Sequence, residues 1–178
     1  EPNTGEAYAR LGQRMSSWMS SQTSAGILFE TDLRLRPNGD AGMLVSTIEG
    51  FREYQLEKAW EWEHQALTRA RFCAGDAELG AQFEAIRIEI LRQPRDLAKL
   101  REDVLVMRKR MLDTHASNSE EVFDIKQDPG GLIDVEFIVQ YLVLGHAHAH
   151  ERLCGNLGNI ALLGIAAELG LVPQALTD

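Results

Sequence analysis

A short run of alternating charged residues is the part of the sequence best suited to chemistry. Four charged residues follow one another at intervals of two: Glu30, Asp32, Arg34 and Arg36. Residues two apart on a strand share a face, so two carboxylates would lie at one end of this row and two guanidiniums at the other. Carboxylate oxygens suit Mg²⁺, and guanidinium groups neutralise phosphate oxygens. The row could therefore bind a magnesium-bound nucleotide.

The same spacing has a simpler explanation. Charged residues at alternate positions often form only the solvated face of an edge strand. In that case Arg34 and Arg36 would pair with the two carboxylates of the row rather than with a substrate. Spacing alone leaves both explanations open.

The row requires a strand, and the local pattern predicts one over residues 26–36. Apolar residues occupy its other face: Ile27, Phe29, Leu33 and Leu35. The sequence PNGD at 37–40 would end the strand in a turn, because proline fixes its own backbone and glycine accepts positive φ.

Most of the remaining chain has apolar residues at helical spacing. A short extended segment at 122–126 is the exception. We expect the helices 77–92 and 97–111 to pack against each other, because the second carries an apolar seam of alternating threes and fours. The other helices are expected at 6–20, at 47–71 with an interruption near Ala59, at 132–144 and at 156–169.

Composition excludes several classes of protein. A hydrophobic content of 44% with 25% charged residues is typical of a globular protein, and no apolar run reaches the ~18 residues that cross a membrane. A net charge of −9 argues against nucleic-acid binding, which relies on basic residues. Two isolated cysteines, Cys73 and Cys154, fit a reducing cytoplasm. The start at Glu1, without a signal sequence, suggests a piece cut from a longer protein.

Three polar residues at successive fours form a stripe on one expected helix: Glu61, Gln65 and Arg69. Such a stripe could steady the charged strand from behind. Core packing is the favoured role of the neighbouring tryptophans.

The nearly apolar helix 132–144 carries two carboxylates that need an explanation. Asp134 falls in the first turn, where a capping role accounts for it. Glu136 shares a face with Gln140, and we favour a structural salt bridge to Lys126 or an arginine over a catalytic role.

Two further features favour structural roles. His146 and His150 are four apart, with His148 between them, a spacing that permits metal binding. A solvated helix end is favoured, because no carboxylate stands nearby in a metal-binding motif. The pair Gly130–Gly131 is too short for a phosphate loop and predicts a tight turn.

Four blocks of sequence, in this order, resemble the glutamine synthetase adenylyltransferase family. They are FETDLRLRPNG at 29–39, GMLV at 42–45, AWEWEHQALTRAR at 59–71, and DIK at 124–126 followed by DPGGLIDVEF at 128–137. That family has two similar halves: one transfers AMP from ATP to a tyrosine of glutamine synthetase, which controls nitrogen assimilation, and the other removes it by phosphorolysis. The aspartate after the glycine pair, where the second half has Arg-Glu, resembles the adenylylating half.

The resemblance implies a mainly α fold. Residues 1–71 would be the end of a polymerase-β-like nucleotidyltransferase α/β domain with one to three strands, and 72–178 a truncated antiparallel helical bundle. Asp32 matches the third metal carboxylate of the family, with Mg²⁺ and ATP as cofactor and substrate. Arg34 and Arg36 would bind the ATP phosphates, and Glu30 is an uncertain metal contact.

The family's glycine-rich turn and Asp-x-Asp pair would precede Glu1, so we expect the chain alone to be inactive. The resemblance implies glutamine synthetase and the PII signalling protein as partners, and glutamine as an effector. Two alternatives are a non-catalytic module that binds PII or links the enzyme halves, and the deadenylylating half.

Overall fold

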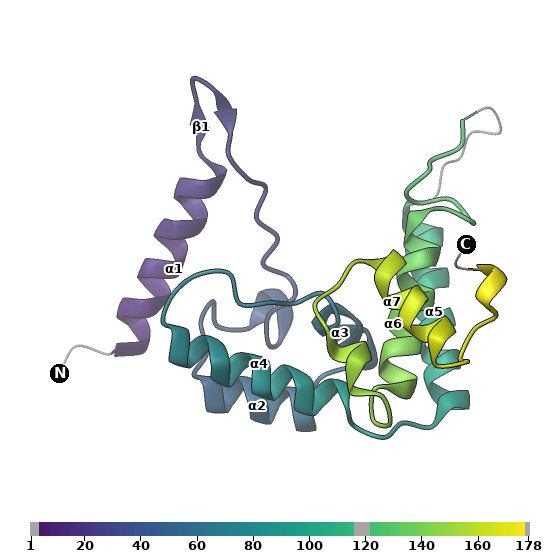
Figure 1. The fold of residues 1–178 in the computed structure, drawn as a ribbon. Helices are drawn as coiled ribbons and strands as arrows, with labels where there is room; N and C mark the ends of the chain where they lie inside the picture. Colours follow the sequence, from purple (N-terminus) through teal and green to yellow (C-terminus); the bar gives the residue numbers. More distant parts are fainter. Residues whose placement is uncertain (1–3, 116–121, 177–178) are drawn as a thin grey trace. The chain divides into compact units, whose positions relative to one another are not determined.

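The computed structural model describes residues 4–115 and 122–176. Within them the chain is mainly helical, with one two-stranded antiparallel sheet (Figure 1). It divides into two compact units, Glu1–Ala59 and Trp60–Asp178. The mainly α fold class is thereby confirmed. The expected domain boundary after Arg71 was drawn from the family resemblance. The division into compact units does not test it, so it stays a prediction.

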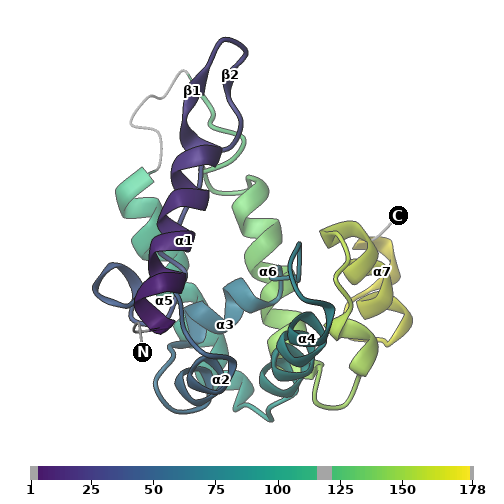
Figure 2. The same ribbon diagram turned by 90° about the vertical axis from the view of Figure 1, so that its left-hand side faces the viewer.

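The first unit consists of a helix, a small hairpin, a looping segment and a second helix. Figure 2 shows the hairpin directly after the first helix. Its two strands pair Gln22 with Ile27 and Thr23 with Gly26. The elements are α1 (Thr4–Ser20), β1 (Gln22–Thr23), β2 (Gly26–Ile27), the 3-10 helix η1 (Gly39–Ala41) and α2 (Ile48–Glu57).

After the hairpin the chain returns beside α1. The amide of Phe29 donates to the Met19 carbonyl at 3.0 Å, and the hydroxyls of Thr31 and Ser16 are 3.0 Å apart. These bonds fix the backbone on both sides of Glu30. The segment that carries the charged row is thus attached to a helix by a few polar contacts.

The expected strand over 26–36 is wrong in its length. Only Gly26–Ile27 pairs with another strand in the described part of the chain. A strand is stabilised by its neighbour, and β1 offers two residues for pairing. The apolar residues expected on the inner face are instead exposed: Ile27, Phe29, Leu33 and Leu35.

The turn expected at 37–40 is confirmed. The Gly39 amide donates to the Arg36 carbonyl at 2.8 Å, with Pro37 and Asn38 between them. Asn38 and Gly39 have positive φ, 61° and 53°. This is the conformation that asparagine and glycine tolerate best, so local sequence chemistry sets the turn.

The second unit is built around a short helix, α3 (Glu61–Leu67), which contacts three longer helices. These are α4 (Ala77–Leu91), α5 (Leu97–His115) and α6 (Leu132–His146). The other face of α6 contacts α7 (Asn159–Glu168), and short 3-10 helices, η2 (Glu151–Cys154) and η3 (Gln174–Leu176), lie beside α7. The most deeply buried side chains come from these helices and η2: Ile90, Leu91, Leu100, Val139, Val143, Leu144 and Leu153.

Most of the expected helices are confirmed, including the interruption near Ala59 that separates α2 from α3. The last helix begins at Asn159 rather than at 156. The expected pairing of 77–92 with 97–111 is wrong, because α5 packs on α6 and α3, whereas α4 packs on α3. The linker between α4 and α5 is anchored by Arg95 and directs α5 toward α6. No described helix is long and apolar enough to cross a membrane.

Gly42 offers a test of the turn before α2. A Cβ at this position would lie 1.9 Å from the Pro37 carbonyl oxygen. We expect Gly42→Ala to lower the free energy of unfolding by about 1–3 kcal/mol, because backbone must move to admit the methyl group. Urea denaturation followed by circular dichroism measures this change.

The matched control is Gly164→Ala in α7, where a Cβ would meet no atom within 4 Å. We expect it to raise stability by about 0.5–1 kcal/mol, because alanine favours a helix interior more than glycine does. Equal effects of the two substitutions would contradict the turn geometry.

Candidate functional site

The charged row places one carboxylate and one guanidinium in direct contact. Arg34 Nη2 lies 2.6 Å from Asp32 Oδ2, and Nε lies 3.0 and 3.1 Å from the two carboxylate oxygens. The Arg34 amide also donates to Oδ1 at 2.9 Å. Of the two explanations drawn from spacing, the pairing of Arg34 with a carboxylate of the row is the one present in this structure.

The bend of the backbone explains this pairing. A straight strand would hold Asp32 and Arg34 about 6.5 to 7 Å apart, but the chain turns at Arg34 and the carboxylate caps the Arg34 amide. Hydrogen bonding from the Arg34 side chain, then from its amide, lowers the pKa of Asp32 to about 2. Asp32 is thus a carboxylate throughout the physiological range.

Both partners are exposed to solvent. The Arg34 side chain is 75% exposed and the Asp32 side chain 51%. Exposed ion pairs contribute little to stability because water screens them. This contact therefore fixes the local arrangement of charge more than it stabilises the fold.

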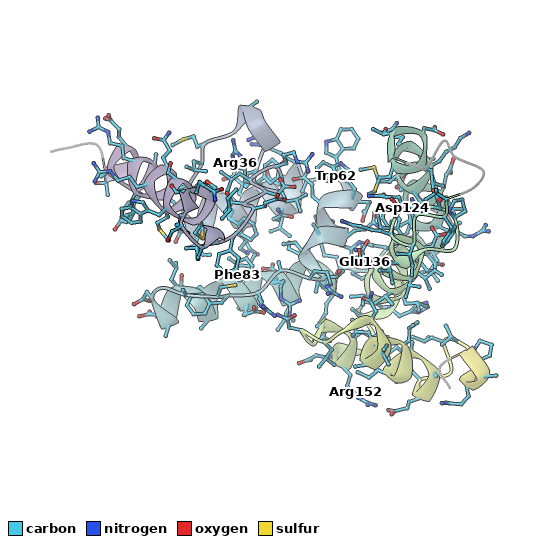
Figure 3. The ribbon with its side chains drawn as sticks, turned by 90° about the horizontal axis from the view of Figure 1, so that it is seen from above. Arg36, Trp62, Phe83, Asp124, Glu136 and Arg152 are labelled. Carbon is cyan, nitrogen blue, oxygen red and sulfur yellow. The ribbon has the colours of Figure 1, made fainter. Side chains whose placement is uncertain are left out.

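The other two members of the row lie apart from this contact. Arg36 (Figure 3) donates through Nη1 to the Leu33 carbonyl at 2.5 Å. Glu30 is exposed and bonds to no residue that the structure describes. The structure therefore joins only Asp32 and Arg34 of the four predicted site residues.

Asp32 fits one contact to Mg²⁺ but not a whole site. Mg²⁺ often reaches a protein through one or two carboxylates and completes its shell with phosphates and water. The exposed carboxylate meets that requirement. Across residues 4–115 and 122–176, no three His, Cys, Asp or Glu side chains gather to hold a metal. The described part of the chain therefore forms no complete metal-binding group around Asp32.

The polar stripe on α3 is a set of contacts within the second unit. Gln65 Nε2 donates to Gln140 Oε1 on α6 at 2.9 Å. Arg69 Nη1 donates to Asn159 Oδ1 at the start of α7 at 2.8 Å. Glu61 accepts from Arg95. The stripe holds α3 to three other elements of this unit, a role in the fold.

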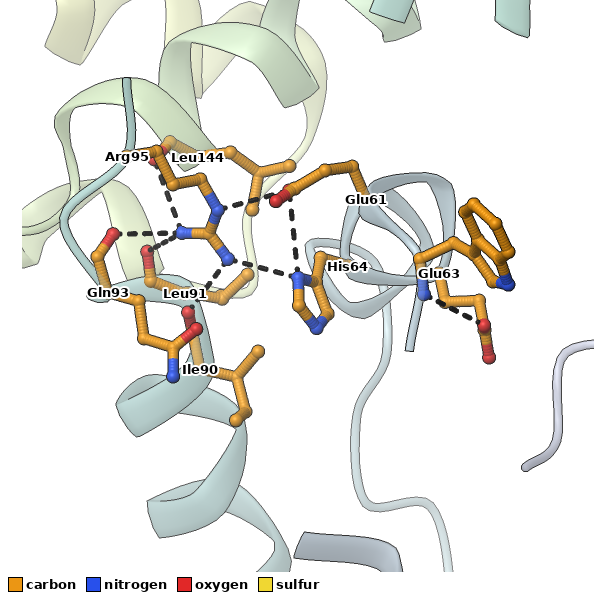
Figure 4. Close-up of polar contacts among 9 residues, drawn as sticks. Glu61, Glu63, His64, Ile90, Leu91, Gln93, Arg95 and Leu144 are labelled. Atoms are coloured by element: carbon orange, nitrogen blue, oxygen red, sulfur yellow. Dashed lines mark hydrogen bonds and ion pairs between the residues drawn. The ribbon is translucent and has the colours of Figure 1, made fainter. Parts of the chain in front are cut away.

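Arg95 is a buried junction that the sequence did not reveal (Figure 4). Its side chain is 6% exposed, and its guanidinium bonds to Glu61 Oε2 at 3.2 Å and His64 Nδ1 at 3.2 Å. It also donates to four backbone carbonyls, three of them in the last turns of α4 and α6. These carbonyls belong to Ile90, Leu91, Gln93 and Leu144.

The charges around this junction balance one another. The neighbouring His64 and Arg95 side chains lower the pKa of Glu61 despite its partial burial. Burial lowers the pKa of Arg95, and Glu61 opposes that shift. His64 Nδ1 lies 3.7 Å from Glu61 Oε2 and 3.2 Å from Arg95 Nη2, so one ring nitrogen faces both charges.

Arg87 is a second buried arginine without an assigned role in the sequence. It is 3% exposed, and it donates to Glu84 at 2.7 Å and to the Cys154 carbonyl at 2.6 Å. Its position next to Ile86, on the apolar face of α4, was the only feature of the sequence that indicated its burial. It connects α4 to η2.

The start of α6 confirms the capping role expected for Asp134. The carboxylate accepts from the Gly130 amide and from Arg108 Nε, each at 2.5 Å. Its pKa is lowered by these bonds and by the Arg108 charge, although desolvation opposes them. A Cβ on Gly131 would lie 2.6 Å from the Ile125 carbonyl, which confirms the tight turn expected at the glycine pair.

The salt bridge expected for Glu136 is wrong. Glu136 (Figure 3) lies half-buried on α6 and forms no ion pair with any residue in the described ranges. The helix carboxylate that does bind an arginine is Asp134, through Arg108. Arg108 is buried on α5, next to Met107 of the expected apolar seam, which did not include it.

The three histidines lie at and beyond the end of α6. Desolvation, followed by the charges of His148 and His150, lowers the pKa of His146. They form no metal-binding group with described neighbours. Their place at a helix end is as expected, and their lack of a role in metal binding stays a prediction.

The comparisons with known proteins bear on the same segment. Residues 2–86, which include Asp32 and Arg34, match the family described as glutamate-ammonia ligase adenylyltransferase. The chain is 67% identical over 175 residues to the bifunctional glutamine synthetase adenylyltransferase/adenylyl-removing enzyme of Aromatoleum aromaticum, covering 98% of this chain and 19% of that protein.

Enzymes with the same description from two other organisms show similar identity. The protein of Nitrosomonas europaea is 60% identical over 96% of this chain and 18% of its own length. That of Chromobacterium violaceum is 55% identical over 99% of this chain and 20% of its own length. The chain spans about a fifth of the length of these relatives.

The chain is similar over nearly its whole length to one segment of these adenylyltransferases. It belongs to the glutamate-ammonia ligase adenylyltransferase family.

Glu61→Gln tests the Arg95 junction through pH. The folded-state pKa of Glu61 lies below its ordinary value of 4.5, so its stabilising contribution is complete above that value and is lost as pH falls through the folded-state pKa. We expect the variant to lose about 1 kcal/mol near pH 7, a figure kept low because the side chain is 35% exposed.

Below about pH 4 the stability difference between variant and wild type should shrink. Urea unfolding at a series of pH values measures it. Glu102→Gln, at an exposed position on α5, is the control and should show a small difference that changes little with pH. A Glu61 difference that grows toward acid would refute the proposed charge balance.

Proposed function

We propose that the chain is part of the adenylylating half of a bifunctional glutamine synthetase adenylyltransferase, acting in the cytoplasm. The reaction is the transfer of AMP from ATP to a tyrosine of glutamine synthetase, with release of pyrophosphate. The observation that carries the proposal is the family match over residues 2–86, because this range contains the exposed Asp32 carboxylate and its neighbouring arginines.

In this mechanism Asp32 would hold Mg²⁺. The bound metal would neutralise charge on the triphosphate and help pyrophosphate leave. Arg34 and Arg36 orient the phosphates with their guanidinium forks, and Glu30 is an additional metal contact on the same segment. The bonds of Phe29 and Thr31 to α1 position this segment. The chain alone, whose described residues form no group of three metal ligands, is expected to be inactive.

The choice of half is supported by the sequence at the start of α6. The motif DPGGLIDVEF at 128–137 has aspartate where the deadenylylating half has Arg-Glu. The relatives are described as both adenylyltransferases and adenylyl-removing enzymes. Glutamine synthetase is the proposed protein substrate, with PII and glutamine as the proposed regulators.

A second candidate function is that of an interaction module that binds PII or connects the two halves. An exposed apolar stripe on α6 favours it: Leu132, Val135 and Ile138 are 56%, 36% and 53% exposed. Ile125, 67% exposed, lies beside this stripe, because its carbonyl accepts from the Leu132 amide at 2.8 Å. Capture of PII by the chain, without binding of MgATP, would support this role.

Asp32→Asn tests the proposed function in a full-length protein. This chain would replace the matching segment of the Aromatoleum aromaticum relative, and AMP incorporation into purified glutamine synthetase would be measured. We expect a loss of about 10²- to 10³-fold, because the amide has no charge to hold Mg²⁺.

Phosphorolytic removal of AMP from modified glutamine synthetase is measured with the same proteins. Glu102→Gln is the control and should leave both activities unchanged. Loss of AMP removal alone would assign the chain to the deadenylylating half. Unchanged activity in both directions would exclude Asp32 from the metal site.

A further inference from the structure

We propose that Arg34 occupies the place of the metal: its guanidinium holds Asp32 in the metal-free chain and moves to phosphate when a metal-bound triphosphate arrives. This inference rests on the proposed function, since it takes Asp32 as a metal ligand. It concerns a step that the activity alone does not reveal, namely the change of partners by one arginine.

The contacts show that the carboxylate is fully engaged. Oδ1 accepts from the Arg34 amide at 2.9 Å and from Nε at 3.0 Å, while Oδ2 accepts from Nε at 3.1 Å and from Nη2 at 2.6 Å. A carboxylate has about four lone-pair sites. A cation that binds either oxygen in this arrangement must displace the guanidinium or share the oxygen with it, and like charges repel at that distance.

Displacement has a different cost with and without phosphate. When a metal ion binds alone, the Arg34 guanidinium loses its hydrogen bonds to the Asp32 carboxylate and bonds to water instead. When the metal ion carries a triphosphate, the guanidinium gains phosphate oxygens, to which it can donate in the same forked manner. Metal and phosphate therefore bind with positive coupling, and Arg34 carries that coupling.

Exposure makes the exchange feasible. A buried pair would lose several kcal/mol if one partner left, whereas the Arg34 and Asp32 side chains are 75% and 51% exposed. Water screens an exposed pair and can replace either partner at small cost. Arg36 serves as the comparison, since the bonds to Asp32 come from Arg34 and Arg36 donates to the Leu33 carbonyl.

The first arm of the test uses Mn²⁺ alone on the 178-residue chain. Paramagnetic broadening of the amide signals of Thr31 and Leu33 gives the dissociation constant for wild type, Arg34→Gln and Arg36→Gln. Both variants lose one positive charge, but only the first loses the bonds to Asp32. We expect Arg34→Gln to tighten Mn²⁺ binding about two- to fivefold relative to Arg36→Gln, the range of a typical exposed ion pair. Asp32→Asn should abolish the broadening.

The second arm measures MgATP binding by calorimetry in the full-length replacement protein. There Arg34→Gln should weaken binding, the opposite sign to the first arm, because the phosphates lose a guanidinium. Equal Mn²⁺ affinity in the two arginine variants, or the same sign in both arms, would overturn the exchange. The Mn²⁺ measurement does not depend on AMP transfer. A replacement protein that is inactive, or that only removes AMP, would refute the proposed function. The Mn²⁺ affinities would still decide whether Arg34 competes with the metal.

Discussion

The burial of a single guanidinium, that of Arg95, governs the arrangement of the second unit. An arginine cannot shed its charge and has five donors, so a side chain that is 6% exposed must find acceptors for them. It finds them on α3 and at the C-terminal ends of α4 and α6. The arginine gains acceptors, and the carbonyls at these helix ends gain a charged donor. These contacts fix the point at which α3, α4 and α6 converge.

The remaining features of the second unit follow from this convergence. With the α4–α5 linker held at the end of α6, α5 can lie along α6, and Leu100 and Val104 reach the core. Arg108, one turn beyond Val104, then meets Asp134 at the opposite end of α6. Both ends of α6 are thus held by buried arginines, one at its last carbonyls and the other at its first turn.

Turns and helices could be predicted from the local sequence, whereas contacts between distant segments could not. The turn after Arg36 depends on the backbone preferences of Pro37, Asn38 and Gly39, and the helices depend on their own periodicity. The strand over 26–36 was overestimated because its length depends on a neighbouring strand, which the local pattern does not specify. Arg95 falls in a short linker, where a charged residue usually implies solvent, and its burial results from three helix ends that converge from distant parts of the sequence.

The charged row shows the same limit in the candidate site. The spacing placed Asp32 and Arg34 on one face and left their pairing open, but it did not predict the bend that brings their side chains together. The bend at Arg34 lets the carboxylate cap the next-but-one amide and draws the guanidinium onto it. The spacing of two therefore allowed the ion pair but did not predict the bend, and the roles of these residues toward a substrate stay predictions.

The two arginine–carboxylate systems differ in exposure, and this difference determines what each can do. Arg95 is surrounded by fixed acceptors and cannot leave Glu61 without leaving a charge unsatisfied in the interior, so it suits a constant structural role. Arg34 and Asp32 are exposed, and water can replace either partner. A site that must admit a cation and an anion together benefits from charges that neutralise each other before binding and separate at small cost. The weakness of this ion pair as a stabilising contact is the property that suits it to binding.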